Sequence, residues 1–323
     1  MRGFSGVSSG SPGLTPAAQR KRAFQTVNNP ANPEEPMELF WQLFVHGLLT
    51  GCLYALVGVS WGLIYATSKV FHFAHVLTLI LATYLAIMVV NDFSAPYWTG
   101  FLVAAVVGGG FGALSEVVVY RPLRRLKATQ LNIFLASIGL LEAGKYTMEL
   151  IWGANQIPVH GASAHAFQFG LISVTLNEFL WLAFSLGLIT ALFIWLNRSR
   201  SGHAIRAVAT NPYLSASVGV SAETVYIKVF VIGSAMVGVA GYLLALSHTA
   251  SLDMGLIPVL AGFTATFLGG VGSLRGAVLG GLLLGLAEQL SGLFLSGQWQ
   301  TVTAFSVLVL VLMLRPQGLF RLR

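Results

Sequence analysis

The chain has 323 residues, of which 55% are hydrophobic and only 9% are charged, with a mean hydropathy of +0.77. Soluble domains carry about 25% charged residues, so this composition excludes an ordinary soluble protein and indicates a chain built for a lipid bilayer. The formal net charge of +7 does not indicate nucleic-acid binding, because the basic residues lie mainly between apolar segments, where they determine membrane orientation.

Residues 1–37 form a polar segment rich in Ser, Gly, Pro and Asn, with the basic triplet Arg20-Lys21-Arg22. They contain no apolar stretch of the kind found in secretory signal peptides. Their low hydrophobicity predicts a disordered tail. Met37 directly precedes the first apolar segment, which suggests it as an alternative start of the chain.

Residues 38–323 are predicted to form one all-α membrane domain of about eight or nine transmembrane helices. The apolar segments are approximately 39–66, 70–90, 97–119, 129–151, 176–196, 225–247, 256–270, 277–295 and 300–314. The seventh and ninth have about 15 residues, which reach only about 22 Å across an apolar core of about 30 Å. The seventh is therefore predicted to be a broken or re-entrant segment, covered by protein or facing water.

With nine spans, most basic residues outside the tail fall on one side of the membrane, which the positive-inside rule makes cytoplasmic. We therefore expect the polar stretch Asn197–Val220 and the C-terminus in the cytoplasm, and the N-terminus outside. The Pro in Tyr120-Arg121-Pro122-Leu123-Arg124-Arg125 is predicted to stop the third span, and the arginines to anchor its cytoplasmic end. The basic N-terminal tail conflicts with this orientation.

Two stripes of small residues predict close helix packing. The residues recur at spacings of three and four, so each stripe lies on one helix face, where another helix can approach closely. The glycines concerned are Gly47, Gly51, Gly58 and Gly62 in the first span, and Gly281 and Gly285 in the eighth. Between the seventh and eighth spans, Gly269–Gly276 is predicted to be a tight turn.

The segment Gly139–Tyr146 resembles a phosphate-binding P-loop but does not meet its requirements. Tyr146 stands where the hydroxyl of Ser or Thr holds Mg²⁺, and the segment has the composition of a membrane helix with no preceding strand. We therefore expect no ATP bound by this chain, and any coupling to ATP requires a partner that carries ATP and Mg²⁺.

Charged residues inside the spans are functional candidates, because each costs about 2.5–3.5 kcal/mol at the bilayer centre. Glu142, Lys145 and Glu149 share one face of the fourth span. They are expected either to pair with one another or to face a watery solute path. Glu288 in the eighth span is a further candidate, with hydrogen bonding to Ser or Thr of a neighbouring helix as the alternative role.

His72 and His75 lie three residues apart at the predicted start of the second span. We expect a polar pair near the solute path rather than a metal site, since no third ligand is close in the sequence and the single cysteine, Cys52, lies within a span. The candidates for the solute path are Tyr54, His72, His75, Glu142, Lys145 and Glu288.

Four parts of the sequence resemble the branched-chain amino-acid permeases of bacterial ABC importers. They are Gly47–Leu56 with Gly62–Tyr65 and Phe73-Ala74-His75; Tyr120–Arg124; Gly202–Ala209 with Gly219-Val220; and Phe267–Ser273 with Gly276–Gly281 and Glu288. The similarity covers about residues 39–320, in order.

The resemblance implies an importer-type permease bundle (type II-like) in the bacterial inner membrane. It also implies partners: a second permease subunit, identical or different, two cytoplasmic ABC ATPases, and an extracytoplasmic solute-binding protein, besides membrane lipid. The stretch Asn197–Val220 corresponds to the ATPase-coupling loop, with Gly202 and Gly219 expected to bound its helix. The candidate coupling residues are Arg198, Gly202, Arg206, Ala207, Asn211 and Gly219.

The sequence departs from the family pattern where solute selection is expected. His72 replaces the family's usual Asn, and Val76-Leu77 replaces a Gly followed by an acid. Glu142 and Lys145 stand where apolar or amide residues are usual, and Arg275 where Pro is common. The solute is thus expected to be a branched-chain amino acid or a related small polar molecule such as urea or an amide. The alternative function is an ion-coupled transporter in which Glu142, Lys145 or Glu288 carries protons.

Overall fold

The computed structural model describes residues 35–161, 165–169, 172–296, 299–315 and 318–319. It contains two units, residues 1–39 and residues 40–323. Most of the predicted polar tail lies outside the described residues. Its last three positions belong to the first turn of a helix, so the first helix begins before the predicted boundary at residue 38.

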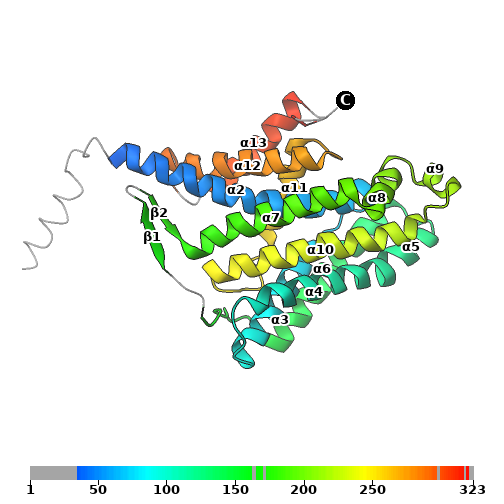
Figure 1. Ribbon diagram of the computed structural model, residues 1–323, viewed down its shortest axis with the longest axis horizontal. Coiled ribbons are helices and arrows are strands. Elements are labelled where there is room, and N and C mark those ends of the chain that lie inside the picture. The colour runs from blue at the N-terminus through cyan, green and yellow to red at the C-terminus, as the bar shows by residue number, and fades with distance from the viewer. Residues whose placement is uncertain (1–34, 162–164, 170–171, 297–298, 316–317, 320–323) are drawn as a thin grey trace, which may run out of the picture. The chain divides into compact units, whose positions relative to one another are not determined.

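Nine long apolar helices are present among the described residues, and they match the nine predicted segments in order. They are α2 Glu35–Ser68, α3 His75–Asp92, α4 Thr99–Ser115, α6 Gln130–Trp152, α7 Leu176–Arg198, α10 Ala222–Ser247, α11 Leu256–Gly269, α12 Leu274–Leu290 and α13 Gln300–Leu314 (Figure 1). The shorter helices are the π-helix η1 Glu116–Tyr120, α5 Arg121–Arg125, α8 Arg200–Thr210, α9 Pro212–Ser217 and the 3-10 helix η2 Ser291–Leu293.

Six of the described helical segments are long and apolar enough to cross a membrane. The remaining three apolar helices are α6, which carries Glu142, Lys145 and Glu149, and the shorter α11 and α13. The prediction of a helical, multi-pass membrane protein is confirmed. Within its 14 residues α11 is one unbroken helix, preceded by a turn at residues 252–255.

A short β-hairpin, which the sequence analysis did not anticipate, joins α6 to α7. Strands β1 Ala166–Phe169 and β2 Ile172–Thr175 pair antiparallel, with Ala166 opposite Thr175 and Phe169 opposite Ile172. Thr175 then caps α7: its hydroxyl accepts a hydrogen bond from the Glu178 amide, and the Glu178 carboxylate accepts one from the Thr175 amide. The hairpin and the capping box together determine where α7 begins.

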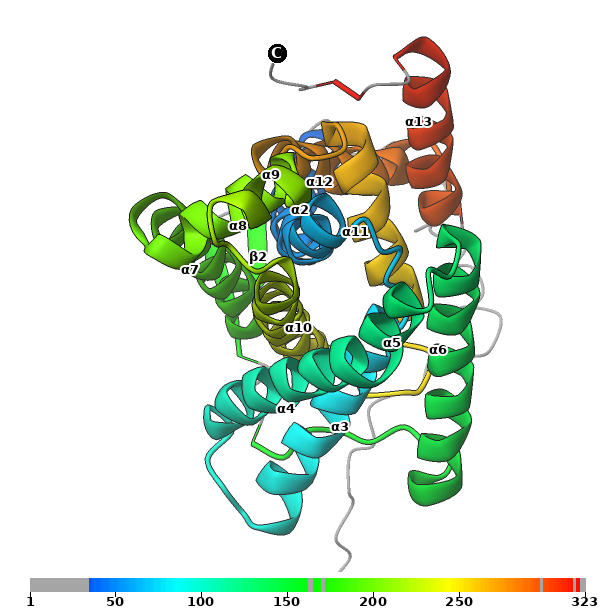
Figure 2. The same ribbon diagram turned by 90° about the vertical axis from the view of Figure 1, so that its right-hand side faces the viewer.

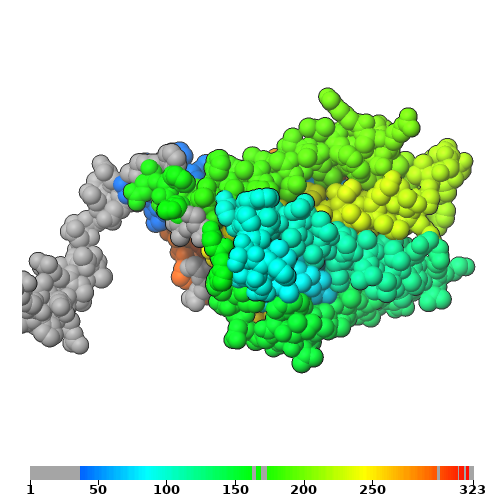
Figure 3. Space-filling view, turned by 60° about the horizontal axis from the view of Figure 1, so that its bottom comes forward, coloured from blue at the N-terminus to red at the C-terminus, as the bar shows by residue number. Residues whose placement is uncertain are grey.

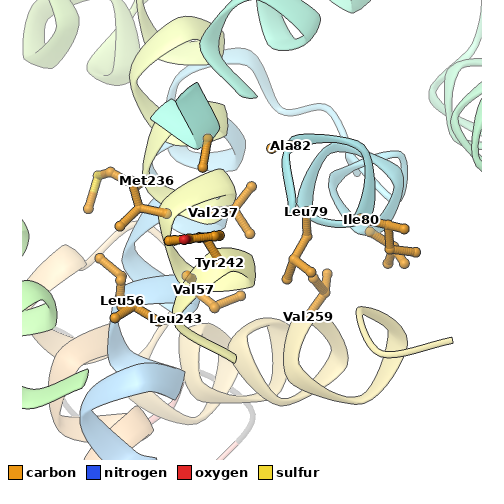
Figure 4. Close-up of a cluster of buried hydrophobic side chains, with 14 of the residues drawn as sticks. Leu56, Val57, Leu79, Ile80, Ala82, Met236, Val237, Tyr242, Leu243 and Val259 are labelled. Atoms are coloured by element: carbon orange, nitrogen blue, oxygen red, sulfur yellow. The ribbon is translucent and has the colours of Figure 1, made fainter. Parts of the chain in front are cut away.

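Helix α2, from residue 40 onward, lies at the centre of the described bundle. Figure 2 looks along it and shows α7 and α8, α10, α11 and α12 around it. The core between α2, α3, α10 and α11 is apolar (Figure 4). It includes Leu56, Val57, Leu79, Ile80, Val237, Leu243 and Val259, all buried. Inside a bilayer such contacts stabilise through van der Waals packing, because lipid tails are as apolar as the side chains.

The two small-residue stripes pack against each other. A Cβ atom on Gly281 would lie 2.5 Å from the Ala55 amide nitrogen, and one on Gly51 would lie 2.9 Å from the Leu282 Cα. Further along α2, Gly58 and Gly62 face α11, and the Thr266 hydroxyl donates a hydrogen bond to the Gly58 carbonyl (2.8 Å). Helix α2 is therefore in close contact with both α12 and α11.

The turn between α11 and α12 is tight, as predicted, with positive φ at Gly270 and Gly272. The described C-terminal residues return to this turn, where the Leu319 amide donates a hydrogen bond to the Leu268 carbonyl (2.8 Å). Figure 1 shows this turn at the same end of the bundle as α5, α8 and α9. The basic segments that the charge pattern assigned to one side of the membrane are thus together in space.

Candidate functional site

The basic stretch 197–220 folds into two short helices rather than one. Ser199 caps α8 by accepting a hydrogen bond from the Gly202 amide (2.9 Å), and Asn211 caps α9 by accepting one from the Leu214 amide (3.0 Å). Gly219, with φ at +85°, follows the end of α9. Gly202 lies within the first turn of α8 and does not bound a helix, contrary to expectation. It is required there because a Cβ atom would overlap the Leu196 backbone.

Helix α8 is fixed to the membrane helices. Ile205 and Val208 are buried, the Arg206 guanidinium donates a hydrogen bond to the Asn197 side chain (2.8 Å), and the Lys228 ammonium donates one to the Ser201 hydroxyl (3.0 Å). Arg198 and Ala207 are exposed.

Helix α9 projects away from these contacts. Tyr213, Leu214 and Val218 are 89%, 67% and 73% exposed. We call the surface formed by Tyr213, Leu214 and Val218 the α9 face. An exposed apolar surface on an anchored helix pair is suited to contact another protein.

A set of ion pairs surrounds α5 at the same end of the bundle. Arg121 and Arg125 both pair with Glu223 of α10, and Arg124 pairs with the fully buried Glu116. The Arg124 guanidinium also lies 4.6 Å from the centre of the Tyr226 ring. The arginines thus clamp α5 to α10 as well as marking the end of a span.

Pro122 does not stop the third span, contrary to the prediction. The π-helix η1 precedes it, and the chain continues as α5 with Pro122 in its first turn. A proline is tolerated there because the first amides of a helix need no intrahelical partner.

His72 and His75 are fully buried in a polar network. His72 Nδ1 lies 2.8 Å from the Tyr120 hydroxyl, which donates to the Ser137 hydroxyl (3.1 Å), and His75 Nε2 lies 2.9 Å from the Ser60 hydroxyl. Since Tyr120 and Ser60 use their own protons elsewhere, each histidine donates to its partner. Burial lowers the pKa of His72 to about 3. The two neutral histidines thus belong to a network that holds the α2–α3 connection to η1 and α6.

Glu288 and Tyr54 meet in a small pocket between α2, α11, α12 and α13. Tyr54 and Glu288 both line this pocket, and both residues are at most 9% exposed. Apolar side chains, among them Ile257, Leu284 and Phe305, form most of the remaining wall. The buried Thr264 hydroxyl, which has no hydrogen-bond partner, also lines this pocket. Glu288 therefore shares this pocket with the hydroxyl-bearing residues Tyr54 and Thr264.

Lys145 pairs with Asp253, in the turn before α11 (2.5 Å), rather than with Glu142 or Glu149. Glu142 is exposed on α6. The structure therefore separates two of the predicted solute-path residues from the pocket at Tyr54 and Glu288.

Sequence reasoning missed Asp253, Glu223 and Thr264. Asp253 and Glu223 are acidic residues just outside an apolar run, and only the fold brings them to Lys145 and to the arginines of α5. Thr264 gave no sequence signal, because a threonine in an apolar helix commonly bonds its own backbone.

A multi-pass helical bundle with an acidic residue buried among its spans, and an anchored helix pair projecting at one end, defines a membrane permease. The comparisons give the particular family. The family model described as "Branched-chain amino acid transport system / permease component" matches residues 43–314. This chain belongs to that family.

Two relatives match along almost their whole length. The high-affinity branched-chain amino acid transport system permease protein LivH of Escherichia coli (strain K12) is 32% identical over 296 residues, covering 87% of this chain and 95% of that protein. BraD of Pseudomonas aeruginosa, with the same description, is 29% identical with the same coverage. The solved structure of PsaBC from Streptococcus pneumoniae in complex with Fab has a TM-score of 0.50 at 12% identity, covering 84% of this chain and 91% of that chain, and supports the fold alone.

Proposed function

We propose that this permease forms half of the pathway of an ATP-driven importer in a bacterial inner membrane, with α8, α9 and the C-terminus in the cytoplasm. The observation that carries the proposal is the α9 face: three exposed apolar residues on a helix pair whose other side is anchored to α7 and α10. One of two ATPase subunits that bind ATP and Mg²⁺ would dock there, and the other would dock on the second permease subunit. A second permease subunit and a solute-binding protein would complete the assembly.

The anchoring contacts explain how movement would reach the membrane. Helix α8 is held to α7 by Gly202 against Leu196 and by Arg206 with Asn197, and to α10 by Lys228 with Ser201. Closure of the ATPases on ATP would displace α9 and α8, and α7 and α10 would move with them. The pathway would then open alternately to the two sides.

We propose a hydrophobic amino acid as the solute, in keeping with the names of the relatives. The Glu288 carboxylate would pair with the solute's ammonium group. In this conformation the pocket is too small for an amino-acid side chain, so it would have to widen as the pathway opens for its apolar wall to receive that side chain. A neutral urea or amide would leave the buried carboxylate without a cation. The charge of Glu288 therefore favours an amino acid over urea or an amide.

The docking proposal is tested with Leu214→Asp, which places a charge in the centre of the α9 face. We expect solute uptake to fall about tenfold or more, because central interface residues carry most of the binding energy. ATPase subunits should no longer co-purify with the variant, while the amount of permease in the membrane stays unchanged. Ser94→Asp, on an exposed loop away from α9, is the matched control. Normal uptake and co-purification with Leu214→Asp would refute docking at this face.

A further inference from the structure

A groove lies on the outer surface of the bundle between α4, α7 and α10, away from the α9 face and the Glu288 pocket. Figure 3 shows α10 on the surface between α7 and the segment containing α4 and α5. Helices α7 and α10 run antiparallel and are joined at both ends. The Trp181 indole of α7 donates a hydrogen bond to the Leu243 carbonyl of α10 (2.9 Å) at one end. At the other end Lys228 of α10 donates one to Ser201 of α8, three residues beyond the end of α7.

The lining of this groove is entirely apolar. Leu188, Ala191 and Trp195 of α7 form one wall, Val231, Ala235 and Val239 of α10 form the other, and Ala105 of α4 contributes to the floor. The lining residues offer no carboxylate, amide or hydroxyl side chain for a polar solute. The groove is therefore suited to a hydrocarbon chain.

Each wall ends in a basic residue, and both basic residues are at the same end. Arg198 follows Trp195 by three positions on α7, and Lys228 precedes Val231 by three positions on α10, so each continues its apolar stripe by one helical turn. Because the helices are antiparallel, the two cations lie at the end marked by the Lys228–Ser201 hydrogen bond. Both residues are exposed.

We propose that this groove binds one acyl chain of an anionic phospholipid, whose phosphate lies between Arg198 and Lys228. The apolar walls match the chain, and the paired cations at the membrane boundary match the negative headgroup. This is a specific lipid site on the permease, and it stands independently of the solute proposed above. A second protein chain in the same groove is the competing occupant.

Trp195 provides a direct probe, because it lines the groove. The full-length chain, with the subunits that accompany it from the membrane, is placed in phosphatidylcholine vesicles containing either brominated phosphatidylglycerol or brominated phosphatidylcholine. The fluorescence of Trp195→Phe is subtracted from that of the unaltered protein, which isolates the Trp195 signal from the other tryptophans. We expect brominated phosphatidylglycerol to quench Trp195 at a mole fraction well below that needed with brominated phosphatidylcholine.

Charge variants test the headgroup contact. Lys228→Gln and Arg198→Gln should each weaken the preference for phosphatidylglycerol about fivefold, as expected for one basic residue at a membrane surface. Lys127→Gln, at an exposed position outside the groove, should leave the preference unchanged. Equal quenching by the two lipids, or an unchanged preference in both groove variants, would overturn the proposal.

Filling the groove tests the acyl-chain contact. Ala191→Phe should reduce quenching of Trp195, whereas Leu186→Phe, on the opposite and exposed face of α7, should not. Should Ala191→Phe fail to fold, the charge variants decide the question alone. If neither brominated lipid quenches Trp195 in the assembled protein, another chain covers the groove and the lipid site is refuted.

Discussion

At the scale of single residues, Glu288 distinguishes between the classes of solute. Its carboxyl group is buried with Tyr54 and has no basic side chain among its pocket neighbours. A carboxylate in such a position favours the binding of a solute that carries a positive charge.

We expect Glu288→Gln to lower the maximal rate of uptake of a branched-chain amino acid about tenfold or more, because a buried charge-assisted hydrogen bond is replaced by a neutral one. Glu288→Asp keeps the charge and should recover part of the loss. The measurement is uptake by intact cells at a saturating solute concentration. An unchanged maximal rate in Glu288→Gln would exclude contact between this carboxylate and the solute's ammonium group.

Gly285 shows how strictly the helix packing depends on single positions. A Cβ atom there would overlap the backbone of Gly51, and neither backbone can move without shifting α12 against α2. We expect Gly285→Ala to destabilise the protein by about 1–3 kcal/mol, as overpacking generally does. Gly139→Ala is the control, since Gly139 is exposed on α6 with no atom near an added Cβ. The midpoint of thermal unfolding in detergent should fall for the first variant only.

At the scale of elements, α9 depends on its cap. It has six residues, too few to be stable as an isolated helix, and Asn211 supplies the side-chain acceptor for its first turn, with Pro212 at the first position. The helix that is proposed to meet the ATPase is therefore held by a few local contacts.

Asn211→Ala should loosen α9 without affecting α8. Loss of an N-cap costs about 1 kcal/mol, so amide hydrogen exchange within residues 213–217 should accelerate about fivefold. Exchange in α8, which has its own cap at Ser199, should be unchanged and serves as the internal control. Equal acceleration in both helices, or in neither, would contradict this role of Asn211.

Apolar runs predicted the membrane helices well. In lipid the backbone of each run must form its hydrogen bonds within that run, whichever helices lie beside it. The same principle says nothing about which helix contacts which. The glycine stripes predicted close packing but not that α2 would contact α12, and the β-hairpin lies in a connection where no lipid constraint applies.

The candidate site was predicted less completely. Glu288, Tyr54 and the histidines stand out as polar groups in apolar helices, so the sequence identifies them. The acidic partners of the basic residues do not stand out: Glu223 pairs with the arginines of α5, and Asp253 pairs with Lys145, across about 100 residues of the chain. Pro122 was misjudged because a local rule for proline could not foresee that η1 would precede it.

At the scale of the whole membrane domain, the structure separates two sets of exposed residues. Tyr213 on α9 and Val271 in the α11–α12 turn lie at the end of the bundle that carries the basic segments. Ser94 and Phe167 belong to the connections at the other ends of the helices, after α3 and in β1. The positive-inside rule assigns the first pair to the cytoplasm and the second to the outside.

Variants with one introduced cysteine test this assignment directly, because the cysteine already present, Cys52, is buried. In intact cells a membrane-impermeant maleimide should label Ser94→Cys and Phe167→Cys. Tyr213→Cys and Val271→Cys should be labelled only after the membrane is opened. The unaltered protein should remain unlabelled in both conditions. Labelling of position 213 from outside would reverse the topology, and with it the cytoplasmic docking of an ATPase on α9.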